Sequence, residues 1–391
     1  MSEMSQLAGK PVHPASNARI WSRDAKKPRG APLAKSGMLW LRAWQSREFA
    51  GARPKMLAAL LMLLVALLLL SLSLGSASIP FDQILIVLTG GEADQRAWTS
   101  IVLKFRLPKT LTAMLAGMAL GVSGLLMQTY FRNPLAEPFV LGVSSGASLG
   151  VALVVLTSGA AGGALLAGLG LAGDLLLTVA AGFGAAMTMG VVLFVALRVQ
   201  SSVTLLILGL MFGYLVAAMV SLLLYFALPE RIQAYINWTF GSFSGVTIEQ
   251  LPILALFALV GLLLSAALVK PLNALLLGED YARSLGVNLK WARIGIVVAT
   301  ATLVSAVTAF CGPIAFIGIA VPHLCRGLLA SADHRLLLPG ACLAGACVAL
   351  CASLIAELPG NNLVLPLNVV TAILGAPVVI LVVLRHARGK L

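Results

Sequence analysis

Charged residues are scarce in this sequence, and their scarcity excludes a soluble globular protein. Only 10% of the 391 residues are Asp, Glu, Lys or Arg, whereas 60% are hydrophobic. Such a chain lacks the polar side chains that cover a soluble domain. Its formal net charge of +13 is better explained by basic loops and a basic tail retained in the cytoplasm than by nucleic-acid binding. We therefore expect a single membrane domain.

Several catalytic motifs are also missing. No GxxxxGK[ST] motif occurs, so the chain has no Walker A loop, and any ATP-driven step requires another subunit. The apolar runs contain almost no ionisable side chains, which argues against an ion-coupled secondary transporter. A membrane enzyme would need a nucleophile, a metal or paired carboxylates at a common depth, and these cannot be assembled from the sequence, so no catalytic residue is predicted. The five cysteines and four histidines lack the spacing of a zinc site, so no metal site is predicted either.

The first 55 residues differ from the rest of the chain. They contain eleven Lys or Arg residues against three acids, and no apolar signal sequence precedes Met56. We expect residues 1–55 to form a basic cytoplasmic arm that is disordered or lies on anionic lipid. Residues 56–391 are expected to form the transmembrane domain.

Ten apolar segments follow, each near the length of about 20 residues that a helix needs to cross the hydrocarbon core. Basic residues cluster at alternate ends of these segments, which places both termini in the cytoplasm. The sequence therefore predicts an all-α polytopic protein of about ten transmembrane helices. The predicted spans run near 56–76, 108–130, 139–158, 172–197, 203–226, 250–269, 293–311, 314–330, 336–356 and 368–385.

Glycines recur at four-residue spacing within these spans. Small residues at this spacing let helix backbones approach closely in lipid. We therefore predict helix-packing faces at Gly117, Gly121, Gly142, Gly146, Gly150, Gly209 and Gly213.

Four separated blocks carry a family resemblance. They are FRNPLAEP after the second predicted span, GPIAFIGIAVPHLCR (Gly312–Arg326), ADHRLLLPG (Ala332–Gly340) and TAILGAP (Thr371–Pro377). In these blocks the chain resembles the FecCD family of ABC importer permeases, which take up iron siderophores, haem or vitamin B12. The resemblance covers roughly residues 56–386.

The resemblance implies a type II ABC importer permease that binds no cofactor of its own. Such a permease forms a homodimer in the inner (plasma) membrane. It works with two ATP-binding cassette ATPase subunits, which use ATP and Mg, and with a periplasmic substrate-binding protein.

The polar loop 270–293 resembles the family's coupling helices, which dock into a cleft on the ATPase subunit. We expect two short helices broken at glycines. Joined rigidly to the neighbouring spans, they can convert ATPase closure into a tilt of those spans. The predicted contacts with the ATPase are Gly278, Glu279, Arg283, Leu285, Gly286 and Val287.

Two constrictions at the cytoplasmic exit are also implied by the resemblance. Asn133 and Leu135 match the first, and Ser202 and Val203 match the second, where the family more often has a Thr-Ser pair. A gate needs small or apolar groups that can meet and part at low energetic cost. Turn formation alone also explains Asn133 followed by Pro134.

On the outer side, Arg106 and Lys109 match a basic pair that meets acidic residues of the binding protein. Exposed ion pairs contribute only about 0 to 1 kcal/mol each, so such contacts mainly fix orientation. The chain departs from the family pattern at Glu357, where the family has a basic residue, and at Asn368, where it has a glycine. Both departures bear on docking of the binding protein.

No residue that the sequence places in the pathway distinguishes one candidate cargo from another. A bare metal ion would require clustered carboxylates or imidazoles, and the spans offer few, so a chelate in a largely neutral cavity is expected. The breadth of the family favours a ferric siderophore, with haem or cobalamin (vitamin B12) as the alternative.

Overall fold

The computed structural model describes residues 47–75, 79–91, 93–157, 171–199, 202–357 and 364–387. Most of the expected basic arm, residues 1–46, lies outside these ranges. Every element within them is a helix. In chain order they are α2 (Arg47–Ser73), α3 (Phe81–Leu88), α4 (Arg96–Ile101), η1 (Val102–Arg106), α5 (Leu107–Tyr130), η2 (Pro138–Leu141), α6 (Val143–Thr157), α8 (Leu171–Arg198), α9 (Ser202–Tyr225), α10 (Pro229–Thr239), α11 (Leu251–Ala267), α12 (Val269–Leu275), α13 (Glu279–Ser284), α14 (Leu289–Cys311), α15 (Ile317–Leu329), α16 (His334–Ala356) and α17 (Leu367–Ala387).

Each of the ten predicted spans coincides with an apolar helix. Six stretches in the described residues are long and apolar enough to cross a membrane, and α11 with α12 adds a seventh if this pair, bent by 53°, is one span. α6, α15 and α17 are apolar but shorter. The six long stretches are Arg53–Ser73, Arg96–Tyr130, Leu175–Arg198, Val203–Tyr225, Leu289–Cys311 and His334–Ala356.

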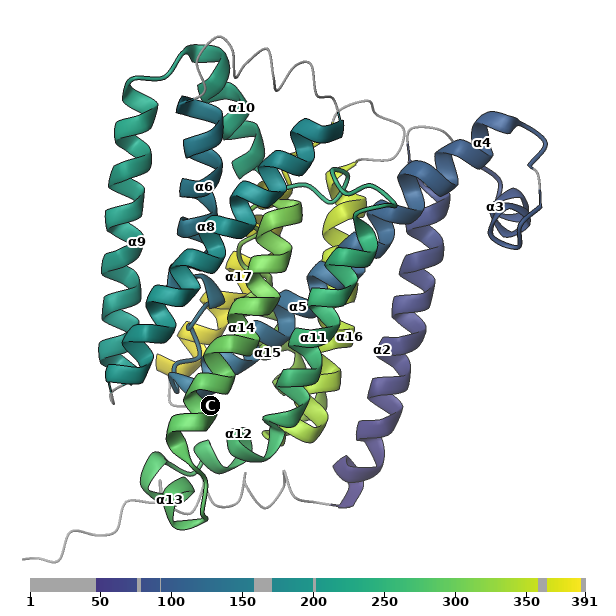
Figure 1. Cartoon of the computed structure of the whole chain (residues 1–391). Helices are drawn as coiled ribbons and strands as arrows, with labels where there is room; N and C mark the ends of the chain where they lie inside the picture. The colour runs from purple at the N-terminus through teal and green to yellow at the C-terminus, as the bar shows by residue number, and fades with distance from the viewer. Residues whose placement is uncertain are drawn as a thin grey trace, which may run out of the picture. The chain divides into compact units, whose positions relative to one another are not determined.

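α5 is the central helix of the bundle. It packs most extensively against α16 and also contacts α14, α15 and α11. Its Leu120, Leu125 and Leu126 are fully buried, whereas α2 and α9 expose most of their apolar side chains. In Figure 1, α2 and α9 lie on opposite sides of this core. The exposed apolar faces of α2 and α9 are suited to lipid or to another apolar helix.

The short helices lie at the two ends of the bundle. Figure 1 shows α10, α3 and α4 at one end and α12 with α13 at the other. We call these the α10 end and the α13 end. α2 begins and α17 ends on the side of the α13 end.

Small residues form the closest helix contacts. A Cβ atom on Gly117 of α5 would lie 2.2 Å from the Gly345 carbonyl oxygen of α16, and one on Gly121 would lie 2.7 Å from that of Ala341. α6 approaches α8 in the same way, since a Cβ on Gly150 would lie 2.1 Å from the Ala180 oxygen. A larger residue at any of these glycines would force the backbones apart.

The other predicted packing glycines have different surroundings. A Cβ on Gly146 would lie 1.8 Å from the Thr188 hydroxyl, but one on Gly213 would reach only ordinary contact with Ser145 at 3.5 Å. Gly142 follows η2 with a φ of 76°, and a Cβ there would lie 3.5 Å from the oxygen of Gly209, which is buried in α9. Gly142 is thus required mainly by the backbone conformation of its turn.

The eighth predicted span, 314–330, is shorter than expected. α15 has 13 residues, which make about 20 Å of helix against roughly 30 Å of hydrocarbon. The preceding residues, 312–316, are not helical, and Phe316 has a φ of 69°. Non-helical backbone at membrane depth is tolerated where protein groups satisfy it.

Asn368 supplies several of these bonds. Its Oδ1 accepts from the Ala315 N–H at 3.1 Å, and its Nδ2 donates to the Pro313 oxygen at 2.7 Å and to the Thr239 oxygen at 2.8 Å. Its own N–H donates to the Phe240 oxygen at 3.1 Å. The residue that replaces the family's glycine therefore joins α10, α17 and the segment before α15.

Candidate functional site

The loop 270–293 forms the predicted pair of short helices. α12 ends at Leu275 and α13 begins at Glu279, after Gly278 with a φ of 118°. Gly286, with a φ of 80°, separates α13 from α14. Since L side chains rarely adopt φ values near 118°, Gly278 permits the sharp turn between the helices.

The surface of this loop carries apolar residues among charged ones. Tyr281, Leu285 and Trp291 are all more than half exposed, while Glu279 is half-buried and Arg283 is exposed. Exposed apolar groups rimmed by charges are typical of a protein interface. An open cavity of about 540 Å³ lies beside them, lined by Leu268, Lys270, Pro271, Ala274, Leu285, Val287, Asn288, Trp291 and Ala292.

The first predicted constriction lies in the hairpin after α5. The side-chain Oδ1 of Asn133 accepts a hydrogen bond from the Leu135 N–H at 2.9 Å. The backbone carbonyl of Asn133 accepts from the Ala136 N–H at 3.0 Å. The side chain of Asn133 thus shapes the turn itself. Leu135 is 41% exposed and is the residue of this pair that can meet an opposing group.

The second predicted constriction lies where α9 begins. Ser202 is the first residue of α9, and the Val203 side chain is 60% exposed. η2, which follows the first hairpin, packs against α9. The two predicted gate segments are therefore connected through one short helix.

α15 holds the hairpin from its other side. The imidazole Nε2 of His323 is 2.7 Å from the Pro134 carbonyl oxygen, and Arg326 donates to the Gln128 side chain at 2.6 Å. Glu137 accepts from the Phe316 N–H at 3.1 Å. Burial raises the pKa of Glu137, against the opposing effect of this hydrogen bond. Sequence reasoning assigned no role to Glu137 because its partner is 179 residues away.

At the α10 end, the predicted docking residues contact other parts of this chain. Arg106 is 7% exposed and donates to the Leu72 oxygen at 2.8 Å and the Ser73 oxygen at 2.9 Å. It therefore caps the carbonyl end of α2, where a positive charge is favourable. Lys109 forms an ion pair with Glu357. The acid that departs from the family pattern thus pairs with one of the predicted docking cations.

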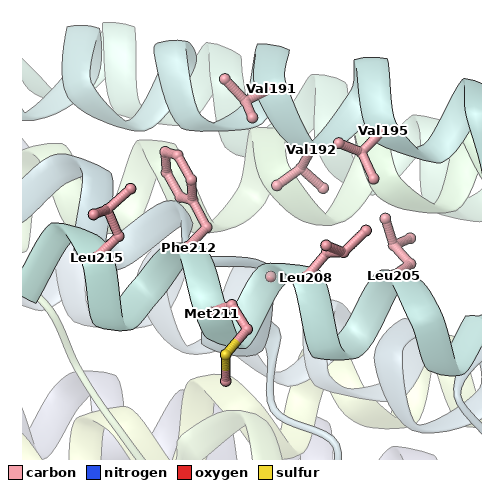
Figure 2. Close-up of a pocket in the computed structure, with 9 residues that line it drawn as sticks. Val191, Val192, Val195, Leu205, Leu208, Met211, Phe212 and Leu215 are labelled. Carbon is pink, nitrogen blue, oxygen red and sulfur yellow. The ribbon is translucent and has the colours of Figure 1, made fainter.

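A pocket between α8 and α9 offers no hydrogen-bonding or charged side chain to a polar cargo. Its volume is about 270 Å³, and Figure 2 shows aliphatic side chains and one phenyl ring around it. None of its lining residues has a hydrogen-bonding or charged side chain. We therefore do not assign the cargo site to this pocket. In the described part of the chain, no three His, Cys, Asp or Glu side chains gather where they could hold a metal ion.

Together, the apolar helices and the paired short helices at one end define a class of protein, the multi-pass membrane transport subunit. Comparison with known families makes this specific. The FecCD transport family matches residues 63–385, and the chain belongs to this family. It is the permease of a FecCD-type ABC importer and not the ATPase. The family inferred from the four sequence blocks is confirmed.

Individual relatives show the same relationship. The chain is 40% identical over 289 residues to the vitamin B12 import system permease protein BtuC of Salmonella paratyphi A and to that of Salmonella typhimurium (strain LT2). These matches cover 73% of this chain and 84% of each relative. A solved structure described as an inward-facing metal-chelate type ABC transporter matches with a TM-score of 0.73 and 29% identity, over 85% of this chain and 99% of that one.

Proposed function

We propose that this chain is the permease subunit of a vitamin B12 (cobalamin) importer. The supporting observation is the 40% identity over 289 residues to permeases named for vitamin B12 import. The sequence alone favoured a ferric siderophore, on the breadth of the family only. The relatives favour the alternative that the sequence left open.

A ferric siderophore is the second candidate. It is favoured by the likeness to the metal-chelate type transporter. The match includes 99% of that transporter's chain. That likeness has a lower sequence identity, 29%. We therefore rank the iron chelate after cobalamin, and haem after both.

The proposed complex contains two copies of this chain, two ATPase subunits that use ATP and Mg, and one binding protein. The ATPase subunits would dock at the α13 end, where Tyr281, Leu285 and Trp291 offer apolar contacts. This end would face the cytoplasm, together with the start of α2 and the end of α17, which lie on its side. The binding protein would dock at the α10 end, on the outer side of the inner membrane.

Within this complex, the loop 270–293 would act as the coupling segment. Leu135 and Val203 would narrow the exit of the pathway, because both are exposed apolar residues, one in the hairpin after α5 and one at the start of α9. Asn133 would act by shaping the first of these turns.

Cargo uptake tests this proposal directly. The permease, ATPase and binding protein are reconstituted in liposomes and supplied with ATP and labelled cyanocobalamin, ferric siderophore or haem. We expect ATP-dependent accumulation of cyanocobalamin above the other two. Accumulation of the siderophore alone would replace cobalamin by the second candidate, and the same liposomes without the permease are the control.

A further inference from the structure

Hydrogen bonds connect both ends of the coupling segment with the neighbourhoods of the two predicted gate segments. The first contact is made by Arg293, the last residue of the coupling segment, in the first turns of α14. Its guanidinium donates to the Val199 carbonyl oxygen, which follows the last residue of α8 and lies four positions before Val203. A cation at the carbonyl end of a helix is favourable.

Arg293 also reaches the other constriction. Its charge interacts with the hydroxyl of Tyr130, the last residue of α5. Tyr130 lies three positions before Asn133.

The second contact begins at Asn273 of α12, at the other end of the coupling segment. Its Oδ1 accepts from the backbone N–H of His334 at 2.9 Å and from the Nδ1 of the same residue at 2.8 Å. Its Nδ2 donates to Asp333 at 2.6 Å. The side chain of Asn273 therefore fastens α12 to the first residues of α16.

His334 continues this contact to α5. Its ring is 1% exposed, and its Nε2 is 2.8 Å from the Thr129 hydroxyl. With Nδ1 donating to the Asn273 oxygen, the neutral Nε2 is an acceptor, so the single Thr129 hydroxyl proton is shared between two acceptors. That hydroxyl also lies 2.9 Å from the Leu125 carbonyl oxygen of its own helix. Thr129 is four positions before Asn133.

We propose that Arg293 and the Asn273–His334–Thr129 chain are positioning residues that transmit movement of the coupling segment to the two gate segments. One end of the coupling segment is bonded to the backbone at the end of α8 and the other to buried side chains at the ends of α16 and α5, so a tilt of α12 or α14 displaces these helix ends. The proposal rests on the proposed coupling and gate roles. It adds the residues through which those roles are connected.

The chain offers matched controls at the α10 end, which lies away from the coupling segment (Figure 1). Arg231 donates to the Leu156 carbonyl oxygen at 3.3 Å, as Arg293 does to Val199. The hydroxyls of Thr110 and Ser71 are 2.9 Å apart, so Thr110 is bonded on α5 much as Thr129 is. If substitution acts only through general stability, Arg293 and its control Arg231 should behave alike, as should Thr129 and its control Thr110. A loss of transmission should appear only in the Arg293 and Thr129 variants.

The first experiment measures labelled cyanocobalamin taken up per ATP hydrolysed by the complete complex in liposomes. Arg293→Ala and Thr129→Val are expected to lower this ratio about tenfold while ATP hydrolysis continues, a size typical of losing a charged or buried hydrogen bond. Arg231→Ala and Thr110→Val should leave the ratio within about twofold. Arg293→Lys and Thr129→Ser, which keep a donor, should restore most of it.

The second experiment needs no cargo. A spin label at Val203 in each copy of the permease reports the distance between the starts of α9 in the two copies, with and without ATP. We expect ATP to change this distance in the wild type and in Arg231→Ala, but not in Arg293→Ala. A change that persists in Arg293→Ala, or an unchanged uptake ratio, overturns the transmission proposal alone. No change in the wild type overturns the coupling and gate roles as well.

Discussion

Replacing Gly117 by Ala should destabilise the bundle, because this glycine sits at the closest approach of α5 and α16. The added Cβ would lie 2.2 Å from the Gly345 carbonyl oxygen and 2.7 Å from the Ala349 Cβ. Real Cβ contacts essentially never fall below 3.0 Å, so the two backbones must separate by at least 0.8 Å, the difference between 3.0 and 2.2 Å. The obstructing atom belongs to a helix backbone and cannot rotate away.

The magnitude follows from two opposing effects. Overpacking a well-packed contact costs about 1–3 kcal/mol. Replacing a helical glycine by alanine alone favours the helix by roughly 0.5–1 kcal/mol. The net free energy of unfolding of Gly117→Ala should therefore fall by up to about 2 kcal/mol.

Gly190 provides the matched control. It lies inside α8, and a Cβ added there meets nothing within 4 Å. Gly190→Ala should therefore raise the thermal midpoint in detergent or leave it unchanged, while Gly117→Ala lowers it. Equal midpoints for the two variants would refute the claim that backbone contact at Gly117 holds α5 against α16.

Three further predictions use the same measurement of thermal unfolding in detergent. Because burial raises the pKa of Glu137 above its ordinary value of 4.5, its ionisation opposes folding, and the contribution of Glu137 to stability should rise as the pH falls through its raised pKa toward 4.5. Glu137→Gln keeps an acceptor for the Phe316 N–H, so it should stabilise the protein at pH 7 and flatten this pH dependence; a pH profile identical to that of the wild type would contradict the assignment. Reversing the ion pair in the double variant Lys109→Glu/Glu357→Lys should restore part of the stability lost in each single variant, by up to about 1 kcal/mol, and additive losses would show that the pair contributes nothing. Asn368→Ala should lower the free energy of unfolding by about 1–3 kcal/mol, since it leaves the Ala315 N–H and two carbonyl oxygens without a side-chain partner, whereas a neutral effect would mean that other groups satisfy them.

Hydropathy located all ten apolar helices because each depends on local composition. The breaks around α13 were also predictable, since Gly278 and Gly286 stand alone in a polar stretch where few other residues permit positive φ. The start of α15 was not. Residues 314–316 are as apolar as the helix that follows, and their non-helical backbone is bonded to Asn368 and Glu137, which are distant in sequence.

The same limit applies to the candidate site. Four-residue spacing identified Gly117 but not its partner Gly345. No glycine lies four positions before or after Gly345, and only its contact with the backbone of α5 shows its role. His334 was visible as part of the ADHR block, yet its bonds to Asn273 and Thr129 span 61 and 205 residues. A family resemblance can point to such residues, but only their tertiary partners show what they connect.

The contacts at the α10 end change which cations are available to a docked partner. Arg106 is committed to the end of α2, and Lys109 to Glu357. An acidic partner that approached this end would meet the exposed side chains of Arg96 and Lys104 more readily. Both belong to the short helices between α3 and α5, where a separate apolar cluster that includes Ile84 and Val102 fixes the backbone. Exposed ion pairs mainly set orientation and association rate. Use of Arg96 and Lys104 in place of Arg106 and Lys109 would therefore move the docked partner without requiring a change in the bundle itself.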